Sequence, residues 1–357
     1  MTIATPVQRQ IVFYLAQDFT LLAFSSAIEA LRLANEVLGV EAYTWRITTA
    51  NGGKVRSSCG VAVESDLAIA AERQNLNSWQ RPSMVVVCGG KNIESHSDRA
   101  VEAWLRECRN RNIALAGVCT GAHVLANAGL LDNKECVIHW ENMPGFAERF
   151  GSVSLNTGIY HIDSNIFTCA GGAATFDMML HIIQRDYDAA VVSDICALAL
   201  VDRVRSAGDR QRVPFARRVG ARDTTVLDLV AKMEQNLAEP LRMEELIGPS
   251  GLSRRQVERL FQAELGCSPA RYYLRLRLER AKLLLVQTRI PIIEIAIACG
   301  FISSSHFSKC YRETYGCSPL ETRGSITQGM RSRRATAKKS GFDRETQFDT
   351  FDHRIPA

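Results

Sequence analysis

The sequence predicts two domains of different class: a doubly wound α/β domain, followed by an all-α domain with two helix-turn-helix units. Three observations lead to this prediction. Short apolar strands alternate with amphipathic helices through the first half of the chain. Near the C-terminus, two segments share a helix, a glycine turn, a second helix and the sequence Cys-Ser-Pro. The chain has 357 residues, which is enough for two separate hydrophobic cores.

In the first half, strands and helices alternate in the way expected for a parallel sheet covered on both faces. Expected strands are residues 10–16, 43–50, 84–90 and 113–119. Expected helices are residues 24–39, 97–112 and 120–131. Further strands are expected within 153–171, and a long helical segment begins at Ala173.

Composition sets the expected domain boundaries. The α/β domain covers residues 10–205, and residues 206–222 form a polar, Arg-rich linker. Residues 223–323 form the helical domain, and residues 324–357 form a basic and polar tail without periodicity, which predicts disorder. Between 223 and 340 there are 19 Lys and Arg against 12 Asp and Glu, whereas the net charge of the whole chain is +5. This concentration of positive charge predicts a polyanionic partner for the helical domain.

The composition also excludes several classes of protein. The longest apolar runs are far too short to span a bilayer, and the N-terminus lacks a signal-peptide pattern. We therefore expect a cytoplasmic protein without membrane contact. The 11 cysteines include no CxxC pair and no Cys/His cluster at zinc spacing. We expect no metal site and no cofactor, and we expect most cysteines to be buried reduced thiols.

The second helix of the first helix-turn-helix unit has two different faces. Ser253 is placed to cap this helix, and Gln256 three residues later completes a capping box. Apolar residues expected to point inward are Val257, Leu260 and Phe261. The outward positions near the start of the helix are Arg254, Arg255, Glu258 and Arg259. Arginine can donate two hydrogen bonds to guanine and glutamate can accept one from cytosine, so this face suits the major groove of DNA.

The second unit repeats this layout after Gly300. Its outward positions are Ser304, Ser305, His306, Ser308 and Lys309. One such pattern could be an ordinary solvated helix face. Two patterns joined by a long basic helix at 269–286 disfavour that alternative. We therefore expect double-stranded DNA as the partner, and a place on the bacterial nucleoid.

In the α/β domain, Cys119 stands at a sharp turn between an apolar strand and a helix. This is the layout of a nucleophile elbow, which holds a side chain beside the free N–H groups of a helix start. Such a position lowers a thiol pKa and can hold an anion such as a carboxylate. Gly89 and Gly90 end the preceding strand and could bring further backbone N–H groups to the same place.

The frame AxxCGFxSxSHFSKxYRxxYGCSP runs from Ala296. On this frame the helical domain resembles the AraC/XylS regulators over about a hundred residues. The resemblance implies two helix-turn-helix subdomains, linked by a long helix, in adjacent major grooves of promoter DNA. The positions that match the family's base-contacting residues are Arg255, Glu258, Arg259, Ser304, Ser305, His306 and Lys309. Pro249 departs from the family pattern and predicts a short first helix in the first unit.

The segments VCTGAHVLANAGLLD, IHWE and CAGGAATFDMMLHII lie in the first domain. With them, residues 10–184 resemble the PfpI/class I glutamine amidotransferase-like domain, which implies a flavodoxin-like fold. This domain followed by an AraC-type module is similar to the GlxA-type group of transcriptional regulators. With FxLLxFSSAIEALRLAN and RRQVERLFQ, the segments are similar to regulators of glycine betaine, carnitine and arginine catabolism. The resemblance is nearest to the glycine betaine/dimethylglycine regulators.

This resemblance implies that a small-molecule effector binds at the Cys119 turn. Expected pocket residues are Cys119, Thr120, His139, Trp140, Glu29 and Gly90. An aromatic face together with a carboxylate suits a trimethylammonium or guanidinium group. For Trp140 and Glu29, core packing and an ordinary surface charge are equally good explanations.

The same resemblance argues against catalysis. In catalytic members an acidic residue before the first helix supports the cysteine, and here that position is Ala23. Thr120 follows the cysteine, and His139 has no obvious acid to complete a triad. A cysteine without a base and an orienting group is a weak nucleophile, so we expect a binding pocket without catalytic residues. The alternative is a DNA-tethered amidase or related hydrolase that uses Cys119.

We therefore expect a transcription regulator, and specifically an activator. A zwitterionic metabolite such as glycine betaine or dimethylglycine would shift the population of arrangements of the DNA-binding module. This shift would change the recruitment of RNA polymerase. A carnitine- or arginine-responsive regulator is the alternative within the same group, and a homodimer is left open. A DNA-architectural protein without an effector is disfavoured, because the first half has a pocket-forming fold.

Overall fold

The computed structural model describes residues 8–93, 98–211, 223–248 and 251–324. The chain divides into two compact units, Met1–Phe215 and Ala216–Ala357. Most of the expected disordered tail (325–357) and part of the expected linker (212–222) lie outside the described residues. In the part of the chain that the structure describes, no helix is long and apolar enough to cross a membrane.

The first unit is built on a seven-stranded sheet with the order β10-β11-β7-β6-β1-β2-β5. Its strands are β1 Arg9–Leu15, β2 Tyr43–Thr49, β5 Leu67–Ala68, β6 Met84–Cys88, β7 Ala114–Val118, β10 Tyr160–Asp163 and β11 Ile166–Cys169. All neighbouring strands are parallel except β10 and β11, where Tyr160 lies opposite Cys169 in an antiparallel pair. The apolar runs of β1, β6 and β7 are buried, as parallel strands covered on both faces require. The doubly wound prediction is confirmed.

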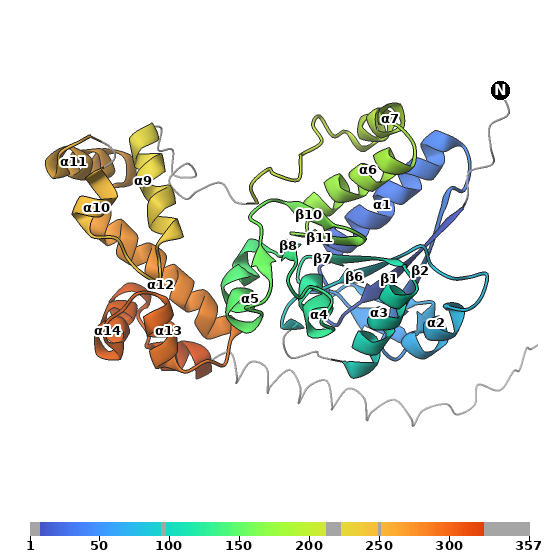
Figure 1. Ribbon diagram of the computed structural model, residues 1–357, viewed down its shortest axis with the longest axis horizontal. Coiled ribbons are helices and arrows are strands. Elements are labelled where there is room, and N and C mark those ends of the chain that lie inside the picture. The colour runs from blue at the N-terminus through green and yellow to red at the C-terminus, as the bar shows by residue number, and fades with distance from the viewer. Residues whose placement is uncertain (1–7, 94–97, 212–222, 249–250, 325–357) are drawn as a thin grey trace, which may run out of the picture. The chain divides into compact units, whose positions relative to one another are not determined.

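Helices cover both faces of this sheet (Figure 1). One face carries α1 Leu21–Leu38, α6 Ala174–Asp186 and α7 Ala189–Ala199. The other face carries α2 Ile69–Asn75, α3 Arg99–Asn110, α4 Gly121–Asn127 and α5 Met143–Arg149. Strand β1 divides its side chains between the two cores: Ile11, Phe13 and Leu15 pack with the first group, and Val12 and Tyr14 with the second. This alternation follows from the two-residue period of a strand.

Two small sheets complete the first unit. Strands β3 Gly53–Arg56 and β4 Ala62–Ser65 pair antiparallel, and β8 Glu135–Cys136 pairs parallel with β9 Ser154–Leu155. A short 3-10 helix, η2 Trp140–Asn142, precedes α5 in the segment between β8 and β9. The strands that we expected within 153–171 are present as β9, β10 and β11.

The strand order reverses beside β1, because β2 lies on one side of it and β6 on the other. In open parallel sheets, ligands bind at such a switch point, outside the carboxyl ends of the strands. The segments that leave β1, β6 and β7 meet there. The N–H of Thr20 donates to the Gly89 carbonyl at 3.0 Å, and the N–H of Gly89 donates to the Val118 carbonyl at 3.2 Å. This edge of the sheet positions the candidate site.

Residues 201–211 follow α7 and remain attached to the first unit; we call this segment the connector. Gln211 Nε2 donates to the carbonyls of Ile138 at 3.0 Å and Gly158 at 2.8 Å. The linker that we expected at 206–222 therefore starts too early. Its first residues satisfy backbone groups of the α/β domain, which composition alone does not reveal.

The second unit is helical. Its helices include α9 Thr224–Gln235, α10 Met243–Ile247, α11 Arg254–Leu265, α12 Pro269–Gln287, α13 Ile292–Ala298 and α14 Ser304–Tyr315 (Figure 1). The long helix α12 joins the two helix-turn-helix units by packing against both. Its Tyr272 meets Phe261 of α11 edge-to-face at 6.0 Å, and its Leu284 lies in one core cluster with Phe307 of α14. The double helix-turn-helix prediction is confirmed.

The first helices of the two helix-turn-helix units differ in length. Helix α10 has five residues and ends before Pro249, whereas α13 has seven. Proline has no backbone N–H with which to continue a helix, so the shorter α10 agrees with the prediction from Pro249.

Candidate functional site

Cys119 joins β7 to α4 and has a φ of +58°. A positive φ is unfavourable for a residue with a side chain, so this is the sharp turn that the sequence predicted. The N–H of Cys119 donates to the Cys169 carbonyl at 3.0 Å, which ties the turn to β11. The residue is only 8% exposed. The thiol is thus held at the carboxyl edge of the sheet, with little access to water.

Two glycines allow the loops after β6 and β7 to touch backbone to backbone. A Cβ on Gly89 would lie 2.3 Å from the Gly121 nitrogen, and a Cβ on Gly121 would lie 2.1 Å from the Val87 carbonyl oxygen. Neither position has room for a side chain, because backbone atoms cannot move aside as a flexible side chain can. The sequence predicted that Gly89 brings a further backbone N–H group to the turn. The structure places Gly89 beside the turn, but its N–H donates to the Val118 carbonyl at 3.2 Å.

Thr20 is a site residue that the sequence analysis missed. Its hydroxyl donates to Cys119 Sγ at 3.3 Å, across 99 residues of sequence. Thr20 occupies the N-cap position of α1 but makes no side-chain hydrogen bond to that helix. A threonine at this position usually caps its own helix. Here its hydroxyl donates to Cys119 instead, and the sequence at the start of a helix does not indicate this partner.

Thr120 and Gly90 are bound to each other. The Thr120 hydroxyl donates to the Gly90 carbonyl at 2.7 Å, and Thr120 is 3% exposed. A Cβ on Gly90 would lie 1.8 Å from the Asp18 carbonyl oxygen, so this loop is packed tightly against the segment after β1. Both residues hold the loop beside Cys119 in place, and the Thr120 hydroxyl and the Gly90 carbonyl are paired with each other.

The pKa of Cys119 is the opposite of what the elbow layout predicted. Burial raises the pKa of the thiol above its usual value, and the Glu141 carboxylate adds to this effect. Hydrogen bonds from Thr20 and from the backbone of Thr120 lower it, but burial is the larger cause. The thiol is therefore protonated at neutral pH. We expected an activated thiolate because a helix start favours negative charge, but exclusion from water outweighs that effect here.

His139 and Trp140 lie together with Glu141, all three at η2. The His139 and Trp140 rings are 5.7 Å apart between centroids and tilted by 35°, and both residues are half-buried. His139 Nδ1 lies 3.8 Å from the Glu141 carboxylate. Burial lowers the pKa of His139, so the imidazole is neutral at pH 7. We expected no acid beside His139. Glu141 is that acid, and it belongs to the same IHWE segment.

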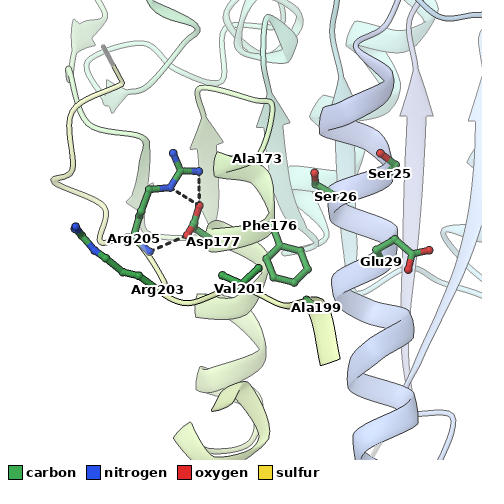
Figure 2. Close-up of a pocket in the computed structure, with 10 residues that line it drawn as sticks. All are labelled: Ser25, Ser26, Glu29, Ala173, Phe176, Asp177, Ala199, Val201, Arg203 and Arg205. Atoms are coloured by element: carbon green, nitrogen blue, oxygen red, sulfur yellow. Dashed lines mark hydrogen bonds and ion pairs between the residues drawn. The ribbon is translucent and has the colours of Figure 1, made fainter. Parts of the chain in front are cut away.

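Glu29 does not share this site. It lies nine residues after Thr20 on α1, which is roughly 13 Å along the helix axis at 1.5 Å per residue. Its carboxylate is 2.8 Å from Arg32, and its side chain is 49% exposed. Glu29 instead lines a surface groove of about 450 Å³, opposite Phe176 of α6 (Figure 2). The sequence could not separate these places, because α1 passes both of them.

The connector forms one wall of that groove. Asp177 of α6, which is 4% exposed, accepts hydrogen bonds from the Arg205 backbone N–H at 2.8 Å and from its guanidinium at 2.7 and 3.0 Å (Figure 2). A charge-assisted contact to a buried carboxylate is stronger than a neutral hydrogen bond. Arg205 therefore fixes the connector against α6, and the spacing of the sequence gave no indication of this contact.

Helix α11 of the first helix-turn-helix unit has the expected faces. Ser253 and Gln256 form the capping box, and Val257 and Phe261 are fully buried. Leu260 is only half-buried. The outward residues Arg254, Arg255, Glu258 and Arg259 are all exposed. Arg254 lies 3.1 Å from Glu258, a contact between neighbouring helical turns on the exposed face.

Helix α14 of the second unit begins at an N-cap, Ser303, whose hydroxyl accepts from the His306 N–H at 3.2 Å. Ser305, His306 and Lys309 are exposed, whereas Ser304 and Ser308 are half-buried. His306 Nε2 also lies 3.4 Å from Cys310 Sγ on the next helical turn. The predicted outward face is therefore mostly exposed, and two of its three serines lie at its edge.

Arg277 of α12 stabilises the turn of the second helix-turn-helix unit. Its Nε donates to the Cys299 carbonyl at 2.8 Å, and its Nη2 donates to the Gly300 carbonyl at 2.7 Å. The guanidinium carbon also lies 4.1 Å from the centre of the Phe301 ring. These contacts satisfy carbonyls at the end of α13 and hold the turn that leads to α14. The sequence analysis counted this arginine only as part of a basic helix.

Comparison with known proteins agrees with both units. Residues 9–185 match the DJ-1/PfpI family, and residues 250–325 match a helix-turn-helix domain family. The HTH-type transcriptional regulator GbdR from Pseudomonas aeruginosa is 41% identical over 315 residues, which cover 88% of this chain and 84% of that protein. The chain belongs to the AraC family of HTH-type transcriptional regulators.

This AraC-family regulator is also similar to two further full-length relatives. The regulator CdhR from Pseudomonas aeruginosa is 34% identical over 311 residues, covering 87% of this chain and 90% of the relative. The regulator GlxA from Rhizobium meliloti is 33% identical over 314 residues, covering 88% and 94%. Because the matches span both units, the pairing of an α/β domain with a DNA-binding module is common to these regulators.

Proposed function

We propose that this regulator binds a small zwitterionic metabolite at the Cys119 turn and thereby changes how its second unit engages promoter DNA. It acts as an activator in the cytoplasm and changes the recruitment of RNA polymerase. The observation that supports binding rather than catalysis is the state of the thiol. It is buried, its pKa is raised, and its side-chain partner is the Thr20 hydroxyl. Among the described residues, no hydrogen bond joins Cys119 to a histidine.

Glycine betaine and dimethylglycine fit the groups around this turn. Each carries a carboxylate at one end and a methylated ammonium group at the other. Backbone N–H groups where β7 turns into α4 suit the carboxylate. The half-buried Trp140 ring, with the Glu141 carboxylate beside it in sequence, suits the cation. Glu29 lies too far along α1 to take part, so Glu141 replaces it in the proposed pocket.

The connector offers a route from this pocket to the DNA-binding unit. Gln211 Nε2 donates to the carbonyl of Ile138, the residue that precedes His139 and Trp140. A ligand that moves this segment also moves the Ile138 carbonyl, which is the acceptor that holds Gln211 at the end of the connector. The effector acts only if it binds one arrangement of the connector better than the other, which is a shift of population.

A direct test measures the melting temperature of the full chain with glycine betaine, dimethylglycine, carnitine or arginine added. A ligand that binds the native state alone raises the melting temperature. We expect the first two compounds to do so, and Cys119→Leu to abolish the effect by filling the pocket. The matched control is Cys59→Leu, because Cys59 is an exposed cysteine of the same unit.

The outcomes separate the parts of the proposal. A shift with carnitine or arginine alone would assign the protein to a different effector. A shift that survives Cys119→Leu would place the pocket elsewhere in the first unit. No shift with any of the four compounds would contradict the proposed effector class.

The Glu141–His139 pair supports one alternative, an amidase that uses Cys119. The carboxylate lies 3.8 Å from His139 Nδ1 and could orient the imidazole. Turnover of small amides by the full chain, compared with Cys119→Ala, tests this alternative. We expect equal background rates, since the thiol is protonated and is not hydrogen bonded to the imidazole. A rate that disappears in Cys119→Ala would support the enzyme instead.

A further inference from the structure

Ile302 is an isoleucine with its side chain fully in solvent, at 103% relative exposure. It stands in the turn of the second helix-turn-helix unit, directly before Ser303, the N-cap of α14. Its neighbour Phe301 is 3% exposed and fills the core. A large apolar side chain in this position has no role in the fold of the unit.

The turns of the two helix-turn-helix units differ in length by this one residue. In the first unit, Gly251 is followed by Leu252 and then by the N-cap Ser253, and Leu252 is half-buried. In the second unit, Gly300 is followed by Phe301, Ile302 and then the N-cap Ser303. The first residue after each glycine packs inward. Ile302 is therefore an extra residue that the second turn holds outside the core.

A structural explanation for an apolar residue before an N-cap is the hydrophobic staple. In a staple, this residue packs against the fourth residue of the helix, which here is Phe307. Phe307 is fully buried, yet Ile302 is fully exposed, so the staple is not formed. The hydroxyl of Ser303 nevertheless fixes the helix start through the His306 N–H. Ile302 is thus held at a defined place beside the start of α14.

The start of α14 is the end at which a recognition helix reaches base edges. The residues that follow, Ser303, Ser304 and Ser305, are small and polar, so Ile302 is the largest apolar group at this end. In the major groove, thymine presents a 5-methyl group, and apolar side chains contact it. We infer that Ile302 contacts the 5-methyl group of a thymine and specifies an A·T pair in the half-site of the second unit.

The experiment uses the full chain and a duplex that it selects itself from a pool of random sequence. Each thymine of the selected second half-site is replaced in turn by deoxyuridine, which removes only the methyl group. Wild type, Ile302→Ala and a matched control, Ile293→Ala, are titrated at one fixed salt concentration. Ile293 is an isoleucine of α13 with 56% exposure. Because both side chains are exposed, neither substitution should change the melting temperature.

We expect one deoxyuridine to weaken the binding of wild type about fourfold, the loss that follows from one buried methyl contact. Ile302→Ala should weaken binding to the thymine duplex by at least as much, and it should lose all sensitivity to that deoxyuridine. Ile293→Ala should keep the full sensitivity. Non-additive losses of this kind are the signature of a direct contact.

Three results would overturn the inference. Additive losses from Ile302→Ala and deoxyuridine would show that the two groups do not touch. Unchanged affinity in Ile302→Ala would show that the side chain makes no contact with the duplex. A gain in affinity of Ile302→Lys for every sequence would place the residue against a phosphate instead. A pool that yields no enriched sequence would overturn this inference and sequence-specific DNA binding together.

Discussion

The two units of this regulator carry their functional groups in opposite ways. In the DNA-binding unit, the proposed reading groups stand on exposed faces of ordinary capped helices, α11 and α14. In the α/β unit, Cys119 is 8% exposed, and its partner Thr20 lies 99 residues away in sequence. A surface of the first kind depends on local sequence, whereas a site of the second kind depends on contacts between distant segments. Substitutions should therefore change affinity alone in one unit, and both stability and response in the other.

The largest effect is expected where the DNA-binding unit also depends on distant contacts. Arg277→Met removes the hydrogen bonds to Cys299 and Gly300, and it leaves both carbonyls without this donor. Loss of charge-assisted hydrogen bonds of this kind should destabilise the unit by about 3 kcal/mol. Urea unfolding of the full chain, followed by circular dichroism, measures the change.

The matched control is Arg271→Met, an exposed arginine on the same helix, α12. Its loss should change the free energy of unfolding by less than about 0.5 kcal/mol. Equal stability of the two variants would contradict the role given to Arg277. It would also restore the simpler view of α12 as a uniformly basic helix.

A smaller effect, confined to communication between the units, is expected from Asp177→Asn. The amide cannot accept all the hydrogen bonds that Arg205 donates, so the connector should loosen at a cost of about 1–2 kcal/mol. Operator affinity without effector should stay unchanged, because the two units have separate cores. The change of affinity caused by the effector should be lost, which titration of the operator with and without effector measures.

Asp209→Asn provides the comparison for Asp177→Asn. Asp209 pairs with Arg203, whose side chain is 71% exposed, and it accepts hydrogen bonds from Ser206. These contacts lie within the connector and do not fasten it to α6. We expect this variant to respond to effector as the wild type does. An Asp177→Asn variant that also responds normally would remove the connector from the proposed mechanism.

On the exposed side of the comparison, Arg259→Ala and Lys309→Ala should weaken operator binding by about 1–3 kcal/mol each where they read a base. Both residues are exposed, so the melting temperature should not change. A base-reading role also requires relaxed preference at one operator position. Unchanged affinity and preference in both variants would show that the wrong helix faces were assigned.

The smallest predicted effect is a difference in alkylation rate between two cysteines of the α/β unit. Burial raises the pKa of Cys119, whereas a hydrogen bond from Ser57 lowers the pKa of the exposed Cys59. Alkylation requires the thiolate, so Cys59 should react with iodoacetamide near neutral pH. Cys119 should react only as pH rises above the usual range for thiols. Pulse labelling at several pH values, followed by peptide mapping, measures both, and equal reactivity at pH 7 would mean an activated Cys119.

The exposed faces of α11 and α14 could be predicted from sequence, because each depends on a single helix. Ser253, Gln256, Val257 and Phe261 fix the orientation of α11 through capping and a 3.6-residue period, and these signals lie within nine positions of one another. The sheet was predictable for a similar reason, since the buried strands are short continuous apolar runs.

The candidate site at Cys119 was only partly predictable. The turn at Cys119 has a local signature, but Thr20 reaches it from the start of α1, and no local pattern indicates which way that hydroxyl points. The thiol pKa was mispredicted because burial depends on the whole surrounding core. The connector was hidden for the same reason, because the partners of Gln211 are backbone carbonyls, which no side-chain pattern marks.

The central claim is that an effector bound at Cys119 controls how the second unit engages DNA. The most direct measurement is the operator affinity of the full chain with and without glycine betaine or dimethylglycine, for wild type and Cys119→Leu. We predict that the effector changes the affinity of wild type about fivefold or more, a usual size for coupling between two sites. Cys119→Leu should bind the operator as wild type does without effector, and it should not respond. A Cys119→Leu variant that responds as fully as wild type would contradict the account.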